Sequence, residues 1–295
     1  MRNTYLILLF SICFQSCEAQ DDYESENNNQ LTNIVEGLNT DVKKLTVMQW
    51  YVGHFSEGRS PKSAITDDNY QAKLDEFLSV VGNDDIDIVS FSEYSVYFAD
   101  TQAHPQDETQ KLLNSFPIFY LGNNGKIRHY SLNAFFSKKY IEQPQTIEYV
   151  SNVNADMGRN GIVVAPDYYY VKSCIDINNK AIKFIATHLA FSKTDSSIVV
   201  NQIKELIEEC VNDEYVIITG DFNVNSPSLY NRFRQNGFVL ANCGDFGNFL
   251  TYPANIPSKM IDNIVVKGLT IDNVRTVKTK LSDHLPIVCD ILLDN

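Results

Sequence analysis

Short apolar stretches of strand length recur along most of the chain, with helical stretches between them. Residues 44–51 and 86–91 form the first two of these stretches. Short runs of this kind, rich in β-branched and aromatic residues, are typical of buried strands. Similar runs complete the predicted set of strands at 131–137, 161–165, 168–177, 181–187, 215–219, 261–266 and 285–292. Asn178-Asn179 separates two of these runs, which predicts a hairpin.

Four other stretches have their apolar residues at helical spacing. Residues 69–81 place these residues on one face, and Gly82 follows as a stop signal. Residues 106–116 and 196–210 predict two further helices. Ser226-Pro227 predicts the start of a fourth helix, because serine is a good cap and proline suits the first turn.

The pattern of these elements predicts the fold class. Hairpins and crossovers both occur among the strands, and helices are interspersed, so the fold class is α/β (α+β), with mixed β-sheets covered by helices. Neither a long linker nor an internal repeat occurs after residue 40. We therefore expect one catalytic domain from 41 to 295.

Residues 1–16 have the pattern of a bacterial lipoprotein signal peptide. The apolar run from Thr4 to Phe14 is shorter than the about 20 residues of a membrane-spanning helix. Ser16-Cys17 follows this run and resembles a lipobox, in which Cys17 is lipidated and becomes the new N-terminus. The alternative is an ordinary secretory signal that is cleaved near Ala19.

Residues 17–40 are acidic and rich in asparagine, which predicts a solvated tether. With a lipidated Cys17, this tether would anchor the domain to a membrane of the cell envelope, outside the cytoplasm. The sequence leaves open which side of the envelope the protein occupies, and also its oligomeric state.

Composition excludes some classes of protein. Apolar residues make up 44% of the chain, which is enough for a core and argues against disorder. The chain has 24 Lys and Arg against 37 Asp and Glu, so its formal charge is −13. Because phosphate neutralisation requires basic side chains, we expect no stable nucleic-acid partner.

Several catalytic motifs are missing. The sequence contains no G-x-S-x-G, H-E-x-x-H, P-loop or G-x-G-x-x-G motif, which disfavours a serine hydrolase, a zincin or a P-loop enzyme. No C-x-x-C pair occurs among Cys174, Cys210, Cys243 and Cys289, so a zinc site is disfavoured and buried thiols are expected.

Polar residues recur where the predicted strands begin or end. These residues are Glu93, His188, Asp221, Asn223, Asp262, Asp283 and His284. A single one of them would be read as a cap or turn former, but a whole set is costly near a core unless its members pair or bind a metal. The oxygen-rich ligands favour Mg²⁺, Mn²⁺ or Ca²⁺ over zinc, with Mg²⁺ or Mn²⁺ as the expected cofactor, and the two histidines can move protons or stabilise negative charge. This combination suits attack on a phosphate ester.

The motifs around these residues resemble those of one known family. They are S-E at 92–93, T-H-L at 187–189, G-D-F-N at 220–223, I-D-N-I at 261–264 and S-D-H-L-P at 282–286. In order and spacing they resemble the endonuclease/exonuclease/phosphatase superfamily from about residue 45 to 292. The resemblance implies a four-layer sandwich of two mixed sheets with helices outside. It also implies metal-dependent cleavage of phosphoester bonds.

The resemblance also implies roles for individual residues. Glu93 resembles the main metal ligand of the family. Asp221 would position or deprotonate the attacking water, and Asn223 would hold the phosphate or the nucleophile. His284 would touch the scissile phosphate, as a base or as an electrostatic stabiliser, with Asp262 as its orienting carboxylate.

Four further residues are candidates for the site. The resemblance implies that Asp283 is a metal ligand or supports one. It also implies that His188 stabilises the developing charge or protonates the leaving group. Asn133, in a stretch that resembles the central strand of the family, and Arg159, just ahead of a predicted strand, are candidate substrate-binding residues.

Tyr51 departs from the family pattern, because relatives usually have an asparagine at the end of the first strand. A neutral phenol is a poorer ligand for Mg²⁺ than an amide oxygen, so Tyr51→Asn is expected to tighten metal binding. Three hypotheses follow. The first is an active phosphohydrolase for a small or headgroup substrate, the second is a nuclease, and the third is a catalytically weakened binding protein.

Overall fold

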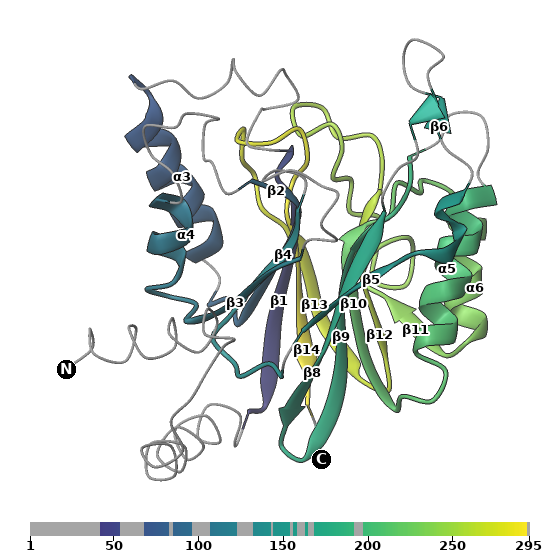
Figure 1. Ribbon diagram of the computed structural model, residues 1–295. Coiled ribbons are helices and arrows are strands. Elements are labelled where there is room, and N and C mark those ends of the chain that lie inside the picture. The colour runs from purple at the N-terminus through teal and green to yellow at the C-terminus, as the bar shows by residue number, and fades with distance from the viewer. Residues whose placement is uncertain are drawn as a thin grey trace, which may run out of the picture.

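Two β-sheets packed face to face, with helices on their outer sides, form the four layers that the resemblance implied (Figure 1). The structure is a computed structural model. It describes residues 42–53, 68–82, 85–95, 107–122, 132–142, 144–153, 156–157, 163–164, 168–191 and 197–293.

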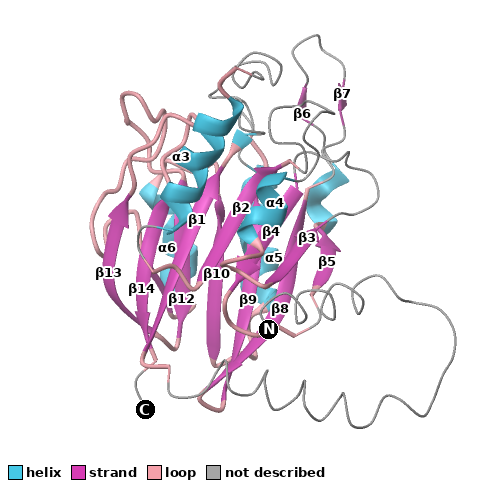
Figure 2. Cartoon of the chain, turned by 90° about the vertical axis from the view of Figure 1, so that its left-hand side faces the viewer, coloured by secondary structure: helices cyan, strands magenta, loops and turns pink. Residues whose placement is uncertain are grey.

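The first sheet has six strands, in the order β13-β14-β1-β2-β4-β3 (Figure 2). Their bounds are Thr270–Thr276 for β13, Ile287–Leu292 for β14, Lys44–Tyr51 for β1, Ile88–Tyr94 for β2, Leu132–Ser137 for β4 and Ile118–Gly122 for β3. Strands β1 and β2 are parallel, and the other pairs are antiparallel. The sheet is therefore mixed, as predicted.

The second sheet also has six strands, in the order β11-β12-β10-β9-β8-β5. Their bounds are Phe238–Leu240 for β11, Asp262–Lys267 for β12, Tyr215–Asp221 for β10, Lys180–His188 for β9, Tyr169–Ile177 for β8 and Gln145–Glu148 for β5. Strands β9 and β10 are parallel. A separate pair, β6 (Asp156–Met157) and β7 (Val163–Val164), is antiparallel.

Alternation along the strands divides the apolar residues among three cores. In β1, Val47 packs between the sheets, whereas Met48 packs under the helices of the first sheet. Those helices are α3 (Tyr70–Gly82) and α4 (Asp107–Leu112). In β10, Ile217 points between the sheets and Ile218 points to the opposite side. The period of two therefore places one side of each sheet in the shared core and the other under helices.

The outer side of the second sheet is covered by α5 (Ser197–Glu209) and α6 (Pro227–Gln235). A short 3₁₀ helix, η3 (Val150–Val153), is held to α5 because the backbone N–H groups of Val150 and Ser151 donate to the Glu205 carboxylate at 2.7 and 2.9 Å. None of the helices within the described residues is long and apolar enough to cross a membrane.

Most predicted elements are present, with shifted ends. The hairpin at Asn178-Asn179 is confirmed, and both residues have the positive φ angles, 53° and 61°, of a tight two-residue turn. Ser226 is the N-cap residue of α6 with Pro227 in its first turn, although the serine side chain makes no capping hydrogen bond. The helix predicted at 106–116 is shorter, and the strand predicted at 161–165 contributes only β7.

The sequence pattern missed β3, β5, β11 and β13. Each lies at an edge of its sheet, and apart from β11 each is largely half-buried or exposed, so its apolar pattern is weak. Backbone pairing with one neighbour holds such a strand in place, and a sequence pattern does not record that pairing. The predicted signal peptide (1–16) and the whole of the predicted tether (17–40) lie outside the described residues.

Gly220 lies where β9 and β10 approach each other beside the predicted site. A Cβ atom there would overlap the carbonyl oxygen of Thr187 and lie 2.8 Å from its Cγ2. We expect Gly220→Ala to destabilise the fold by about 1–3 kcal/mol, because the strands must separate. Gly82→Ala, at the end of α3, is the matched control, since within the described residues no atom outside its own helix and chain neighbours lies within 4 Å of the added Cβ. Urea unfolding of both variants checks this; equal stability would contradict the close approach.

Candidate active site

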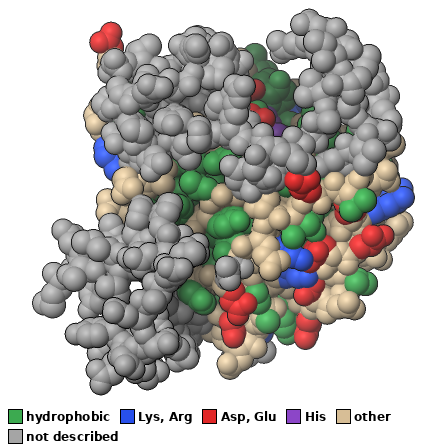
Figure 3. Space-filling view, viewed as in Figure 1, with side chains coloured by type: hydrophobic (Ala, Val, Ile, Leu, Met, Phe, Trp, Pro, Cys, Tyr) green, Lys and Arg blue, Asp and Glu red, His purple; other side chains and the backbone are tan. Residues whose placement is uncertain are grey.

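The predicted polar residues meet at one end of the sandwich, where strands of both sheets end side by side. Asp221 is paired in register with His188 of β9 on one side and with Asp262 of β12 on the other. In the facing sheet, Tyr51 is paired with Ser92. Acidic and histidine side chains are visible next to each other at the upper end of the molecule (Figure 3). Register therefore brings the strand-end side chains together within each sheet, and the packing of the two sheets brings the two groups together.

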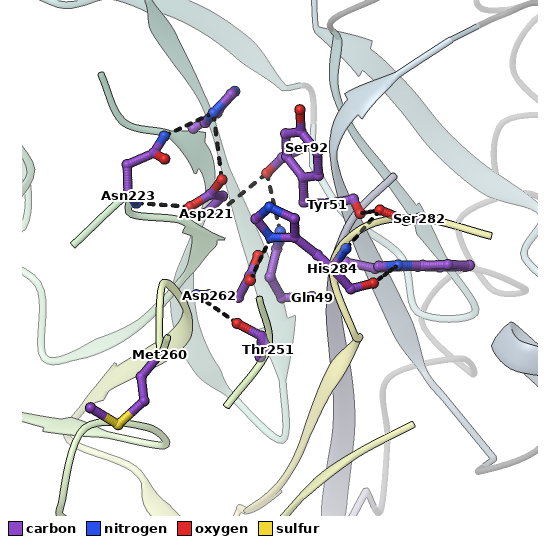
Figure 4. Close-up of polar contacts among 12 residues, drawn as sticks. Gln49, Tyr51, Ser92, Asp221, Asn223, Thr251, Met260, Asp262, Ser282 and His284 are labelled. Atoms are coloured by element: carbon purple, nitrogen blue, oxygen red, sulfur yellow. Dashed lines mark hydrogen bonds and ion pairs between the residues drawn. The ribbon is translucent and has the colours of Figure 1, made fainter. Parts of the chain in front are cut away.

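Ser92 fastens the two sheets to each other beneath these side chains (Figure 4). Its hydroxyl group donates to the backbone oxygen of Thr187 at 3.2 Å and accepts from Gln49 Nε2 at 3.1 Å. The backbone N–H of Asp221 also lies within 3.4 Å of Ser92 Oγ. One buried hydroxyl thus links β2 to β1, β9 and β10. The relative position of Glu93 and Asp221 is set by this link.

His284 and Asp262 form a buried pair. The imidazole Nδ1 lies 2.8 Å from Asp262 Oδ2, and the two side chains are 5% and 0% exposed. Burial by itself lowers the pKa of His284, but the carboxylates of Asp262, Asp221 and Asp283 outweigh it and raise that pKa to about 9. The imidazole is therefore protonated at neutral pH.

The backbone around His284 is also fixed. Its N–H donates to Ser282 Oγ at 3.1 Å, and that hydroxyl group donates to the backbone oxygen of Tyr51 at 2.7 Å. The indole N–H of Trp50 donates to the backbone oxygen of His284 at 3.1 Å. These bonds connect the loop before β14 to the end of β1, so the imidazole is held from both its ring and its backbone.

Asp221, Asn223 and His188 form a second connected group. The backbone N–H of Asn223 donates to Asp221 Oδ1 at 2.8 Å. Its side-chain Nδ2 lies 3.1 Å from His188 Nε2 and donates to the backbone oxygen of Leu189 at 2.8 Å. An amide NH₂ group can only donate, so Nε2 of His188 is the acceptor in this contact. His188 Nδ1 then faces Glu93 Oε1 at 3.9 Å.

Carboxylates are crowded at this end of the sandwich. Burial, then the charge of Asp262, and to a smaller extent that of Glu93, raise the pKa of Asp221 well above its ordinary value. Burial, followed by Glu93 and Asp262, raises the pKa of Asp283. Both shifts have the same physical cause, because buried like charges oppose ionisation. A cation in this space would relieve the repulsion.

The residues fit a divalent cation. Glu93, Asp221, Asp262 and Asp283 supply carboxylate oxygens, which Mg²⁺ and Mn²⁺ favour. Asp262 Oδ1 is buried and has no hydrogen-bond partner within the part of the chain that the structure describes, so part of the acceptor capacity here is unused. Ligand atoms of Asp221, Asp262 and His284 lie within 4.8 Å of one another. This group differs from the ligands predicted from sequence, Glu93 and Asp283, whose assignment stays a prediction.

Two further candidates have different outcomes. Asn133 is buried at the start of β4, and its side-chain Nδ2 donates to the backbone oxygen of Tyr169 at 2.8 Å. Its amide group therefore ties β4 to β8, and a role in substrate binding stays a prediction. Arg159 lies outside the described residues.

Sequence reasoning missed several residues that hold the site. Tyr252 packs against the imidazole of His284 at 4.9 Å between ring centroids, and Tyr168 lies edge-on to His188 at 6.0 Å. Ser92 and Ser282 belong to the S-E and S-D-H-L-P motifs, so their position in these motifs could have indicated them. The two tyrosines follow no spacing rule, because loop contacts across the chain bring them here.

The His284–Asp262 pair generates a pH-dependent prediction. In the presence of EDTA, NMR titration of the histidine rings should show one imidazole titrating near pH 9. Asp262→Asn should lower the pKa of His284 markedly, because it removes the carboxylate that contributes most to raising this pKa and leaves the opposite effect of burial in place. The raised pKa means that the pair stabilises the folded state fully below about pH 6.5, and this contribution is lost as pH rises through about 9. Urea unfolding at pH 6 and 9.5 should therefore show a shrinking difference between the two proteins.

A matched control for this measurement is Asp176→Asn. Asp176 is an exposed aspartate paired with Ala181 near the turn of the β8–β9 hairpin, at the opposite end of β9 from His188. This variant should keep the titration near pH 9. An imidazole of His284 that titrates near pH 6.5 in the unmutated protein would contradict the assignment of a protonated pair.

Similar solved structures share this architecture. An endonuclease/exonuclease/phosphatase from Bacteroides vulgatus superposes with a TM-score of 0.62 at 16% identity, covering 86% of this chain and 100% of that chain. D. rerio TDP2, humanized by 14 mutations, gives a TM-score of 0.61 at 15% identity, covering 84% of this chain and 98% of that one. At these identities the similarity establishes the fold. A comparison with curated protein sequences gives no match.

The sequence itself carries the family assignment. The sequence profile of the Endonuclease/Exonuclease/phosphatase family matches residues 65–284, which is most of the chain. The matched region ends at His284 and includes the other strand-end residues of the site. From this match and the shared fold we conclude that the chain belongs to the endonuclease/exonuclease/phosphatase family.

Proposed function

We propose that this protein hydrolyses a phosphate ester with a divalent cation, Mg²⁺ or Mn²⁺. Membership of the family supports phosphoester hydrolysis in general. The observation that carries the finer proposal is the convergence of the buried His284–Asp262 pair with Asp221 and its neighbours at one end of both sheets. A site that needed only stable strand ends would not bury opposed carboxylates beside an imidazole.

We assign the cation to Glu93 and Asp283. Both carry carboxylates at the rim of the site, and Glu93 is 22% exposed, so it remains accessible to an ion and its water. When bound, such a cation polarises a phosphoryl oxygen and neutralises negative charge. The same charge would allow an anionic substrate to approach the crowded carboxylates.

His284 acts as a hydrogen-bond donor to the phosphate. Asp262 occupies its Nδ1, so Nε2 is the nitrogen left for the substrate. With the pKa of His284 at about 9, this nitrogen carries a proton at neutral pH. Donation to the scissile phosphate would stabilise the charge that develops in the transition state. The geometry thus favours the electrostatic role over the role of base.

Asp221 is the better candidate for accepting the proton of the attacking water. It is buried, and its raised pKa makes it a stronger base than a free aspartate. Asn223 accompanies it, because its backbone N–H holds one carboxylate oxygen and its amide contacts His188. His188, with Nε2 accepting from Asn223, is placed to orient this group and to meet charge on the leaving group.

A small phosphoester is the favoured substrate class, such as a sugar, inositol or lipid headgroup ester. The net charge of −13 opposes tight binding of long polyanions. A nuclease is the alternative, and one similar structure is D. rerio TDP2 complexed with single strand DNA product, at 14% identity. A weakened binding protein is the second alternative, because Tyr51 stands where relatives usually have asparagine.

Metal dependence and two substitutions test the proposed enzyme. Hydrolysis should require Mg²⁺ or Mn²⁺ and stop in excess EDTA. Asp221→Asn and His284→Ala should each lower kcat/KM at least about a hundredfold, since each removes a positioned proton-transfer or charge-stabilising group. Asp176→Asn should retain the unmutated rate.

The substrate panel for this test contains phosphomonoesters, headgroup diesters, and single-stranded and duplex DNA. Faster cleavage of DNA than of the small esters would establish the nuclease alternative. Binding without turnover would favour the binding protein. Full turnover in EDTA, or near-normal rates in both site variants, would remove the proposed mechanism.

We further propose that Cys17 is lipidated and anchors the protein outside the cytoplasm in the cell envelope. A single acyl chain binds a membrane only marginally, so stable attachment needs several chains, as a bacterial lipoprotein carries. The acidic stretch that follows would hold the domain away from the membrane surface.

Metabolic labelling with a radiolabelled fatty acid checks this anchor in a bacterial host. Cys17→Ser should abolish the label and release or misprocess the chain. Cys13→Ser is the matched control, because Cys13 lies within the apolar run and should not be the acylated residue. Label that persists in Cys17→Ser would show that lipid is attached elsewhere, and absence of label in the unmutated protein would favour the ordinary secretory signal.

A further inference from the structure

Tyr51 lies at the centre of a row of rings that crosses the site. Its ring stacks on the imidazole of His284 at 4.2 Å between centroids, with an interplanar angle of 29°. It also meets the imidazole of His188 edge-on at 5.6 Å. The row continues to Tyr252 beyond His284 and to Tyr168 beyond His188. Only Tyr51 contacts both histidines in this row.

The hydroxyl group of Tyr51 reaches a third residue of the site. It donates a hydrogen bond to Glu93 Oε2 at 2.7 Å, and the other carboxylate oxygen, Oε1, faces His188. A phenol bonded to a carboxylate is a strong, charge-assisted contact, and it fixes the direction of that carboxylate. One side chain therefore touches the proposed cation ligand and the proposed phosphate-binding imidazole at once.

The backbone is built to hold the phenol in this position. The carbonyl oxygen of Tyr51 accepts from Ser282, and the N–H of the next residue, Val52, donates to the backbone oxygen of Ser92 at 3.0 Å. Gly53 follows with a φ of +49°, and a Cβ atom on it would lie 2.8 Å from Cε1 of Tyr51. The glycine thus leaves room for the ring, and the ring is not a loose surface group.

We infer that Tyr51 is a positioning residue of this site: its hydroxyl group orients the Glu93 carboxylate for the cation, and its ring orients the His284 imidazole for the phosphate. This inference rests on the proposed function. It reverses the expectation drawn from the strand position alone, in which the phenol merely replaces a better ligand. A residue that orients a ligand acts on affinity through that ligand, and loss of such a residue lowers metal affinity by about 10–100-fold.

Three substitutions separate the hydroxyl group from the ring. Tyr51→Phe removes only the hydrogen bond to Glu93, Tyr51→Leu also removes the ring, and Tyr51→Asn supplies the amide that relatives usually have. Tyr120→Phe is the matched control, because this half-buried tyrosine contacts Thr146 Oγ1 at 3.1 Å and lies outside the site. Its loss removes a phenol hydrogen bond without touching Glu93.

The first readout is the binding of Mn²⁺ to the purified full-length chain in the absence of substrate. The EPR signal of the free ion measures this binding. Tyr51→Phe and Tyr51→Asn should each raise the Mn²⁺ dissociation constant at least about tenfold, whereas Tyr120→Phe should leave it within about twofold. Each variant is titrated well below its own melting temperature. Unchanged or tighter binding in Tyr51→Phe or Tyr51→Asn would overturn the inference.

Steady-state kinetics at saturating Mn²⁺ is the second readout. Tyr51→Leu should lower kcat at least about tenfold below that of Tyr51→Phe, with a smaller change in KM, because the ring orients a group that acts in the transition state. Equal kcat in these two variants would overturn the role of the ring. If the unmutated protein binds no Mn²⁺, the proposed metal-dependent function itself fails; binding that the Tyr51 variants leave unchanged overturns only the inference on Tyr51.

Discussion

Two carboxylates, those of Asp221 and Asp262, are buried opposite each other on neighbouring strands, and the rest of the site follows from that constraint. Buried like charges repel strongly, and each one lacks the solvation it would have in water. His284 meets part of this demand by accepting a proton and pairing with Asp262 at 2.8 Å. One imidazolium does not balance two buried carboxylates together with Glu93 and Asp283 nearby. The remaining negative charge makes this end of the sandwich suited to a cation.

Two residues at this end of the sheets have left-handed backbone conformations. Glu93 and Asn223 have φ angles of 53° and 52°, in the left-handed region that residues other than glycine, asparagine and aspartate rarely adopt. Such a conformation persists only where surrounding contacts hold it. Asn223 is held by Asp221 and Leu189, and Glu93 is held by the phenol of Tyr51. Both side chains lie against the imidazole of His188, so these two left-handed conformations occur within the proposed active site.

The layered fold supplies the rigidity that this arrangement needs. Three apolar cores pack the two sheets against each other and against the helices, so the strand ends cannot separate to relieve the repulsion. The buried hydroxyl group of Ser92 and the contact of Thr219 Oγ1 with Ser90 Oγ at 2.9 Å join the facing sheets just beneath the charged residues. An apolar core that carries a few satisfied polar links therefore holds an electrostatically unfavourable site in one geometry.

The sequence by itself determined the central strands, the helices and the strand-end positions of the polar residues. Period-two alternation and helical spacing are local properties of the chain. The motifs around Glu93, Asp221 and His284 could be recognised from the sequence because each of them is also a short local segment. Tertiary structure alone decided the edge strands, the link through Ser92 and the position of Tyr51 between two histidines. The phenol meets Glu93 across 42 residues of sequence, and the Tyr51 carbonyl meets Ser282 across 231. Contacts at such separations depend on how the two sheets are packed together, and no local pattern in the chain encodes them.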